Sequence, residues 1–232
     1  MSKNFICKEY IKYSVGDGFF YCHVEAQHAV PPNSDLFTKK ITTKIIKKTG
    51  CAGIISTVSR VSADLNRIPN EFNKKAISEY RNSIKNILQH LSILNSKNYL
   101  VSKPYLHLSI HGMKDIHHGA FAIEVGTFDG QSCSMEMKEW FRNILLEKSQ
   151  KFLPPTKIIF DEIFDGDKSI VFHRIGDNIE YAGYGPNFHT FQIEISLTLR
   201  KHHLYEIVEL FSQIIYQFQE EIVNESEKKR ID

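Results

Sequence analysis

Apolar residues along this chain follow two alternating patterns. Short runs of β-branched and aromatic residues bounded by Gly, Pro or Asn are typical of strands, and apolar residues repeating every three or four positions are typical of helices. The clearest helical repeat places Ile77, Tyr80, Ile84 and Leu88 on one face of the segment 71–98. Strands are predicted over 18–27, 51–59, 104–113, 119–127, 169–175 and 189–200, and helices over 35–50, 71–98, 134–152 and 204–223.

This alternation predicts an α/β fold. Strands separated by helices favour a mostly parallel (mixed) central sheet with helices on both faces. A chain of 232 residues with 42% hydrophobic residues is long enough for one domain to bury roughly 70% of its unfolded surface. We therefore expect a single domain over residues 1–224, followed by a charged, frayed tail at 225–232.

Charge and cysteine usage exclude several classes of protein. The net charge is only +2 and no long basic tract occurs, so nucleic acid is not an expected partner. No apolar run is long enough to cross a bilayer, so no membrane association is expected. The four cysteines have no C-x-x-C spacing and the N-terminus has no apolar signal region, which predicts a cytoplasmic protein with free thiols.

Candidate chemistry lies where predicted strands end, because ligands of such sheets bind beyond the carboxyl ends of the strands. His28 and His111 each follow a strand, and Asp35 lies seven residues after His28. Two imidazoles and one carboxylate, with a fourth position left to water, form the usual ligand set of a catalytic zinc ion. Asp35 has a second interpretation, as the N-cap of the helix that follows it.

Glu194 is the other candidate, and its role depends on where its strand lies. In the alternating segment 189–200, Glu194 shares one face with Gln192 and Ser196. On an edge strand it would be an ordinary solvent-facing residue. On a central strand it would be a carboxylate beside the crevice, suited to act as a general base.

Five segments occur in the order and approximate spacing of a known family. They are "EAQHAVPP", "SRVSADLNR", "LSIHGM", "VGTFDGQSC" and "FQIEIS", and the second and fourth are the most specific. Over most of its length the chain thus resembles the N-formylglutamate amidohydrolases, relatives of the zinc carboxypeptidases. The resemblance implies a zinc-carboxypeptidase-like fold and hydrolysis of an amide bond by water activated on one zinc ion.

The resemblance also implies roles for individual residues. His28, Asp35 and His111 would bind zinc, with Glu25 as the alternative carboxylate ligand, and Glu194 would be the base. Asn66 and Arg67 would hold the free carboxylate of an N-acyl amino acid or short peptide, since an arginine fork matches a planar carboxylate. Arg60 would polarise the scissile carbonyl, with Asp64 as a possible internal ion-pair partner of one arginine.

Two departures from the family pattern keep other functions open. This chain has "HAV" where family members have a His-Ser-Gly or His-Pro-Gly turn, and Ser109 where they have an Asp that orients the second histidine. The alternatives are a zinc carboxypeptidase, a peptidoglycan- or polyglutamate-type amidase, and a catalytically inactive member that binds a carboxylate ligand or a partner. The sequence does not indicate an oligomeric state.

Overall fold

The computed structural model describes residues 5–97 and 99–225, so the predicted tail lies outside the described residues except for Glu225. The strands are β1 (Ile6–Cys7), β2 (Ile11–Ser14), β3 (Cys22–Ala26), β4 (Ala52–Ser56), β5 (Tyr105–Met113), β6 (Ala122–Gly126), β7 (Lys157–Phe160) and β8 (Phe188–Ser196). The helices are α1 (Thr38–Thr49), α2 (Lys74–His90), α3 (Asp115–His118), α4 (Met135–Phe152), α5 (Lys168–Ile175), α6 (Leu197–His202) and α7 (Leu204–Gln217), which continues as the π-helix η1 (Phe218–Asn224).

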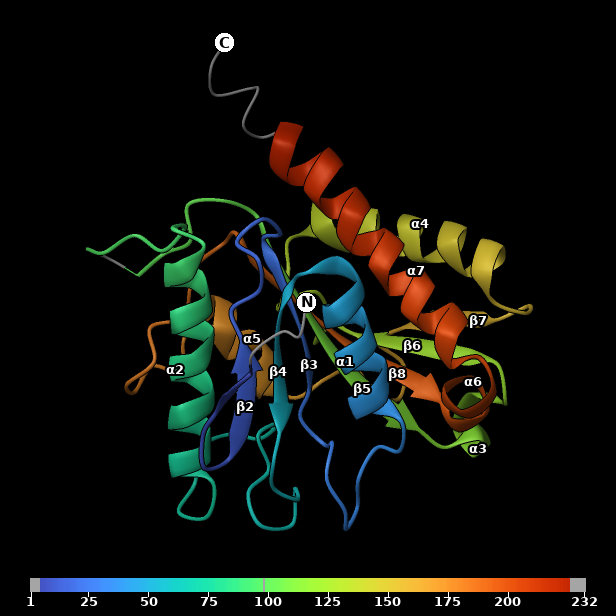
Figure 1. The fold of residues 1–232 in the computed structure, drawn as a ribbon, viewed down its shortest axis with the longest axis horizontal. Coiled ribbons are helices and arrows are strands. Elements are labelled where there is room, and N and C mark those ends of the chain that lie inside the picture. Colours follow the sequence, from blue (N-terminus) through green and yellow to red (C-terminus); the bar gives the residue numbers. More distant parts are fainter. Residues whose placement is uncertain (1–4, 98, 226–232) are drawn as a thin grey trace.

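The described strands form one mixed sheet in the order β1-β2-β4-β3-β5-β8-β6-β7. The four central strands β4, β3, β5 and β8 run parallel, whereas β2 pairs with β4 and β6 pairs with β8 in antiparallel register. Figure 1 shows α1, α4 and α7 in front of the sheet and α5 behind it. The predicted α/β class and the helices on both faces are confirmed.

One face of the central strands is apolar. Val24 of β3, Leu108 of β5 and Ile193 of β8 are fully buried in the larger hydrophobic core, which α1, α4 and α7 complete. Gly53 of β4 lets α1 approach closely, because a Cβ there would lie 2.0 Å from Ile46 Cδ1. This face supplies most of the apolar burial that stabilises the fold.

The opposite face of the same strands is polar although it is buried. Its side chains form rows across the sheet, because the strands are paired in register. The rows are His23, His107 and Thr190, then Glu25, Ser109 and Gln192, then His111 and Glu194. A buried polar layer requires partners for its donors and acceptors, so this face is where the chemistry of the protein is expected.

The structure corrects one predicted strand and shortens another. Residues 169–175 form helix α5, because the Asp167 side chain caps it by accepting a hydrogen bond from the Ser169 N–H. The strand predicted over 189–200 ends at Ser196, where α6 begins. The pattern also did not predict β1, β2 or β7, which are four residues long or shorter.

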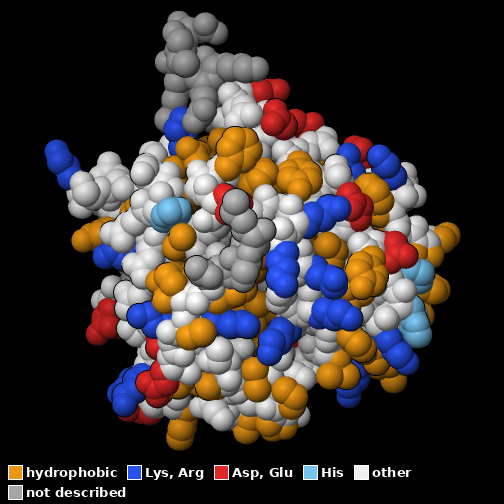
Figure 2. All heavy atoms as spheres, viewed as in Figure 1, with side chains coloured by type: hydrophobic (Ala, Val, Ile, Leu, Met, Phe, Trp, Pro, Cys, Tyr) orange, Lys and Arg blue, Asp and Glu red, His pale blue; other side chains and the backbone are white. Residues whose placement is uncertain are grey.

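Lysines gather on the outer side of α1, across the middle of the face shown in Figure 2. Lys39, Lys40, Lys44 and Lys47 line a shallow hollow there. The apolar side of α1 is buried, so its lysines occupy the side that faces solvent. Among the described residues, no helix combines the length and apolar composition needed to cross a membrane.

Candidate active site

A polar pocket of about 480 Å³ opens at the carboxyl ends of the central strands. β4, β3, β5 and β8 run parallel, so the segments that follow them or end them meet at one edge of the sheet. All the residues predicted for the site line this pocket: His28, Asp35, Arg60, Asn66, Arg67, His111 and Glu194. The structure therefore brings together side chains from five separate segments, as the sequence predicted.

Two imidazoles converge on one carboxylate oxygen in the pocket. Asp35 Oδ2 lies 3.3 Å from His28 Nδ1 and 3.2 Å from His111 Nδ1. The two rings stand at 74° with centroids 4.7 Å apart, so their Nδ1 atoms can point at a common position. A backbone hydrogen bond of 2.8 Å from the Asp35 N–H to the His28 carbonyl closes the loop that brings Asp35 here.

Asp35 does not cap α1. That helix begins at Thr38, and no side chain caps its N-terminus. The Asp35 carboxylate instead accepts a hydrogen bond from the Gly112 N–H at 3.2 Å. The N-cap interpretation was wrong because the carboxylate is turned away from the helix, toward the two histidines.

Asp64 orients His28 from the other side. Its Oδ1 lies 2.9 Å from His28 Nε2, so this nitrogen carries a proton and donates it. Burial alone would lower the pKa of His28, but hydrogen bonds to Asp35 and Asp64 outweigh it and raise that pKa. His28 Nδ1 then faces Asp35 either as a proton donor or as a lone pair that needs a cation between the two groups.

These donors fit a metal ion. Imidazole Nδ1 of His28, imidazole Nδ1 of His111 and a carboxylate oxygen of Asp35 are three ligand types that zinc accepts, and all lie within 4.8 Å of one another. Hydrogen bonds to Asp35 from both rings also hold its pKa below the usual range against the opposing effect of burial, so it is ionised. The open pocket beside them leaves room for water or substrate.

A buried arginine supports the Asp35 loop. Arg200 donates through Nε to the Ile195 carbonyl at 2.8 Å and through Nη2 to the Met113 carbonyl at 2.9 Å, and its Nη1 donates to the Leu36 carbonyl. The guanidinium also packs against Gly112, where a Cβ would lie 2.3 Å from Cζ. Arg200 thus ties the ends of β5 and β8 to the residue after Asp35, a role that the sequence analysis did not foresee.

Glu194 lies on a central strand, between β5 and β6. It is 7% exposed and lines the pocket, so the solvent-facing interpretation is excluded. Burial raises the pKa of Glu194 to about 7. A carboxyl group with a pKa near neutrality can both take and return a proton, which is the property of a general acid–base group.

The segment from Arg60 to Arg67 forms a wall of the pocket that adjoins the metal-ligand candidates, since Asp64 of this segment contacts His28. Arg60 Nη2 donates to Asp64 Oδ2 at 3.2 Å, so the internal ion pair considered from the sequence is present. The Asn66 side chain is buried and donates to Gln192 Oε1 at 3.0 Å. The Arg67 side chain is 49% exposed, and its Nη1 donates to the Asn66 carbonyl at 2.8 Å and pairs with Asp167 at 3.6 Å, contacts that leave Nε and Nη2 available to a ligand.

The loop over residues 163–167 closes the remaining side of the pocket, and hydrogen bonds to Glu124 hold it in place. Glu124 Oε1 accepts hydrogen bonds from three successive backbone N–H groups, those of Glu162, Ile163 and Phe164, at 2.6–2.9 Å. The loop then crosses Gly126, where a Cβ would lie 2.4 Å from the Phe164 carbonyl. No motif in the sequence indicated this loop, because the clamp joins residues about 40 positions apart.

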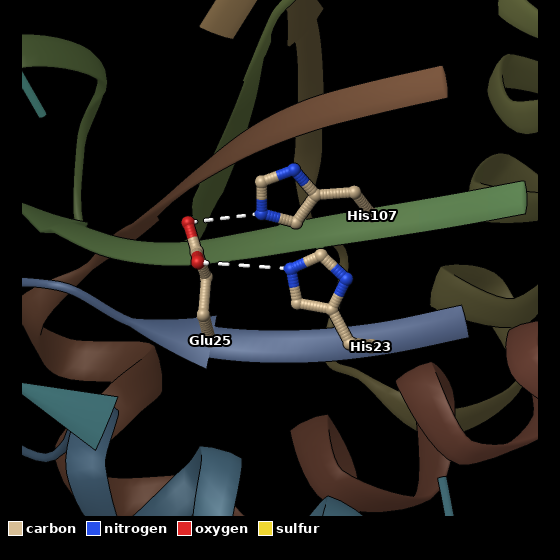
Figure 3. Close-up of side chains that lie close together, drawn as sticks. All are labelled: His23, Glu25 and His107. Atoms are coloured by element: carbon tan, nitrogen blue, oxygen red, sulfur yellow. Dashed lines mark ion pairs between the residues drawn. The ribbon is translucent and has the colours of Figure 1, made fainter. Parts of the chain in front are cut away.

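A second group of two histidines and a carboxylate lies deeper on the same face. Figure 3 shows His23 and His107 each facing one oxygen of Glu25, with distances of 3.8 Å and 2.9 Å. The rings are stacked, with centroids 4.1 Å apart and an angle of 16°. Nearly parallel rings cannot both direct an in-plane lone pair at one ion, so this arrangement does not match a metal site.

The two carboxylates considered as ligands lie in different groups. Glu25 is fully buried beside His23 and His107, whereas Asp35 lies with His28 and His111. His173 packs against His107 in the same buried layer, and neither His173 nor His189 lines the pocket.

No protein-family model matches the chain, nor does any curated protein. Several solved structures do match the fold of this chain. N-formylglutamate amidohydrolase from Ralstonia eutropha superposes with a TM-score of 0.63 at 14% sequence identity, over 92% of this chain and 98% of that one.

The chain has the fold of N-formylglutamate amidohydrolase. A gene product from Agrobacterium tumefaciens has a TM-score of 0.57 at 11% identity, over 90% of this chain and 94% of that one. A bacteriophage poly-gamma-glutamate hydrolase has a TM-score of 0.52 at 11% identity, over 92% and 91% of the two chains. The resemblance noted in the sequence is therefore confirmed at the level of the fold.

Proposed function

We propose that this protein is a zinc-dependent amidohydrolase that cleaves the amide bond of an N-acyl amino acid or short peptide bearing a free carboxylate. The observation that carries the proposal is the convergence of His28 Nδ1, His111 Nδ1 and Asp35 Oδ2 in a pocket that also contains Glu194. The solved structures that share the fold include enzymes named for hydrolysis of such substrates, which supports the same class.

His28, Asp35 and His111 are the residues that would hold the metal. When bound, a zinc ion would act as a Lewis acid and lower the pKa of a water molecule toward about 7. Asp64 would keep His28 oriented by accepting its Nε2 proton at 2.9 Å. Because each imidazole must present a lone pair, protons compete with the metal and binding should weaken as the pH falls.

Glu194 is the proposed general base. Its carboxylate takes a proton from the attacking water and returns it to the leaving nitrogen, which a pKa near 7 permits in both directions. Gln192, which lies two residues before it on the same face, donates to Glu194 Oε1 at 3.4 Å. This contact would keep the carboxyl group aimed into the pocket.

Arg67 and Arg60 are proposed to recognise negative charge on the substrate. Arg67 is half exposed at the pocket wall, and its planar guanidinium can hold a carboxylate through two parallel hydrogen bonds. Arg60, which also lines the pocket, would stabilise the charge that develops on the carbonyl oxygen during attack. Asn66, engaged with Gln192 and Ser169, would position Arg67 and complete the pocket wall.

Substrate discrimination by Arg67 tests the proposal. Arg67→Ala should lower kcat/KM for an N-acyl amino acid by about 100-fold or more, since a charge-assisted bidentate contact is lost. The same variant should change kcat/KM for the matching C-terminal amide little. An equal loss on both substrates would mean that Arg67 has a structural role, and no turnover of any N-acyl amino acid by the zinc-loaded protein would reject the proposed activity.

A further inference from the structure

Asp64 bonds to Nε2 of His28, but within the described part of the chain no carboxylate bonds to Nε2 of His111. His111 Nε2 lies 3.0 Å from the hydroxyl of Ser109, two residues earlier on β5. A hydroxyl alone is a weak partner for a ring that must be held in one orientation. The question is therefore what fixes the Ser109 hydroxyl.

Glu25 fixes it. The Ser109 hydroxyl donates to Glu25 Oε1 at 2.8 Å, and the two residues are paired across β3 and β5. A carboxylate only accepts hydrogen bonds, so the single hydroxyl hydrogen of Ser109 is committed to Glu25. The Ser109 oxygen then acts as the acceptor toward His111, whose Nε2 must carry the proton.

The direction of these hydrogen bonds determines the free nitrogen of His111. With its proton on Nε2, the neutral ring has its lone pair on Nδ1, which is the atom that lies 3.2 Å from Asp35 Oδ2. The chain from Glu25 through Ser109 thus selects the tautomer that a metal ligand needs. It also fixes the plane of the ring, since Glu25, Ser109 and His111 are each at most 1% exposed.

His23 and His107 explain why Glu25 can stay ionised although it is fully buried. Burial would raise the pKa of Glu25, but its interactions with His107 and His23 outweigh burial and hold that pKa well below its usual value. The 2.9 Å contact with His107 meets the distance of a hydrogen bond but not its angle. Both rings are anchored in turn, His107 Nδ1 to the Thr190 hydroxyl at 3.1 Å and His23 Nδ1 to the Tyr105 hydroxyl at 2.9 Å.

We propose that Glu25, acting through the hydroxyl of Ser109, is the carboxylate that positions His111 for metal binding. The buried His23–Glu25–His107 group is then the support of the metal site rather than a second metal site. This inference rests on the metal centre of the proposed function. Ser109 and Glu25 are positioning residues, since neither lines the pocket.

The proposal is tested by the zinc affinity of four proteins. Each affinity is measured at one pH by competition with a chromophoric chelator. The proteins are the wild type, Ser109→Ala, Glu25→Gln and the double variant. Each single change should weaken zinc binding by about 10- to 100-fold, as loss of a group that orients a ligating histidine does. In the Ser109→Ala background, Glu25→Gln should weaken binding by no more than about threefold further, because the link is already broken.

A matched control and a second readout separate positioning from general damage. Ser212→Ala makes the same chemical change at a fully buried serine on α7, whose hydroxyl bonds only to the Val208 carbonyl, and should leave zinc affinity unchanged. Nitrogen-15 NMR of the zinc-loaded wild type should show a proton on His111 Nε2, the atom that faces the Ser109 hydroxyl. In Ser109→Ala this proton should exchange faster with water while the circular dichroism spectrum remains native.

Three results would overturn the proposal. Wild-type affinity in Ser109→Ala would show that the hydroxyl does not position His111. Additive losses in the double variant would show that Glu25 acts by a route other than Ser109. Absence of zinc binding by the wild type would reject the metal centre itself, and with it both the proposed function and this inference, whereas the first two results leave the proposed function intact.

Discussion

Two groups of two histidines around a carboxylate lie on the same polar face of the sheet, and they differ in geometry and in access to water. In the open group, His28 and His111 stand at 74° around Asp35 at the wall of a pocket. In the sealed group, His23 and His107 stack at 16° beside Glu25, and all three are at most 1% exposed. The two rings of the open group can direct their lone pairs at one ion, whereas the nearly parallel rings of the sealed group cannot.

The comparison shows that ligand identity alone does not make a metal site. Both groups offer two imidazoles and one carboxylate within 4.8 Å of one another. What differs is the ring orientation, which neighbouring hydrogen bonds set: Asp64 turns His28 and Ser109 turns His111. The sealed group lies on the same strands toward their amino ends, and none of its three residues lines the pocket.

The largest expected difference between the two groups is in turnover. Glu194→Gln, beside the open group, should lower kcat by about 100- to 10,000-fold, because a general base is removed while the zinc ligands remain. His23→Gln, in the sealed group, should leave kcat nearly unchanged at saturating zinc. Steady-state kinetics with parallel zinc analysis measure both effects, and turnover retained by Glu194→Gln would show that another residue is the base.

The free energy of unfolding should depend more on the sealed group than on the open group. Glu25→Gln should lower the free energy of unfolding of the metal-free protein by about 2–3 kcal/mol, because it takes the carboxylate partner away from the buried side chains of Ser109, His107 and His23. The matched change Asp35→Asn should lower it by about 1 kcal/mol, since water in the pocket can solvate the two freed imidazoles. Urea unfolding followed by circular dichroism compares them, and equal losses would mean that the two groups have the same structural role.

The pH dependence of stability should give the smallest difference. Burial raises the pKa of Glu194 to about 7 from its ordinary value of 4.5, so the folded metal-free protein keeps a proton that the unfolded chain releases. The wild type should therefore lose about 2–3 kcal/mol relative to Glu194→Gln as the pH rises from 4.5 to 7, and no more above 7. Burial lowers the pKa of His23 to about 4, so its NMR shifts should stay constant between pH 8 and 5.

A flat difference between wild type and Glu194→Gln over this pH range would place the pKa of Glu194 near its ordinary value. Movement of the His23 signals between pH 8 and 5 would show that water or a proton reaches the sealed group. Either result would weaken the distinction between an open and a sealed group.

The sequence predicted the class of the fold and the location of the candidate residues at strand ends, but not several details of the fold; the roles of the candidate residues stay predictions. The positions of His28, His111 and Glu194 followed from the rule that strand ends carry the ligands, and all three line the pocket. The segment 169–175 was mistaken for a strand because its short β-branched and aromatic stretch has no clear period, and the Asp167 cap that starts α5 lies outside the segment.

Other features depend on contacts between distant segments, which a single sequence does not show. Whether Glu194 faced solvent or the pocket depended on the strand order, which places β8 between β5 and β6. The link from Ser109 to Glu25 joins residues 84 positions apart and depends on the register of two strands. The alternation of polar residues along β3 and β5 was the one local signal for it.

Zinc content tests the central claim most directly. Wild type, His111→Ala and His107→Ala would each be incubated with zinc, freed of unbound ion and analysed by plasma mass spectrometry. We expect about one zinc per chain in the wild type and in His107→Ala, and almost none in His111→Ala. Zinc retained by His111→Ala but lost from His107→Ala would place the ion in the sealed group, and a wild type without zinc would contradict the metal centre altogether.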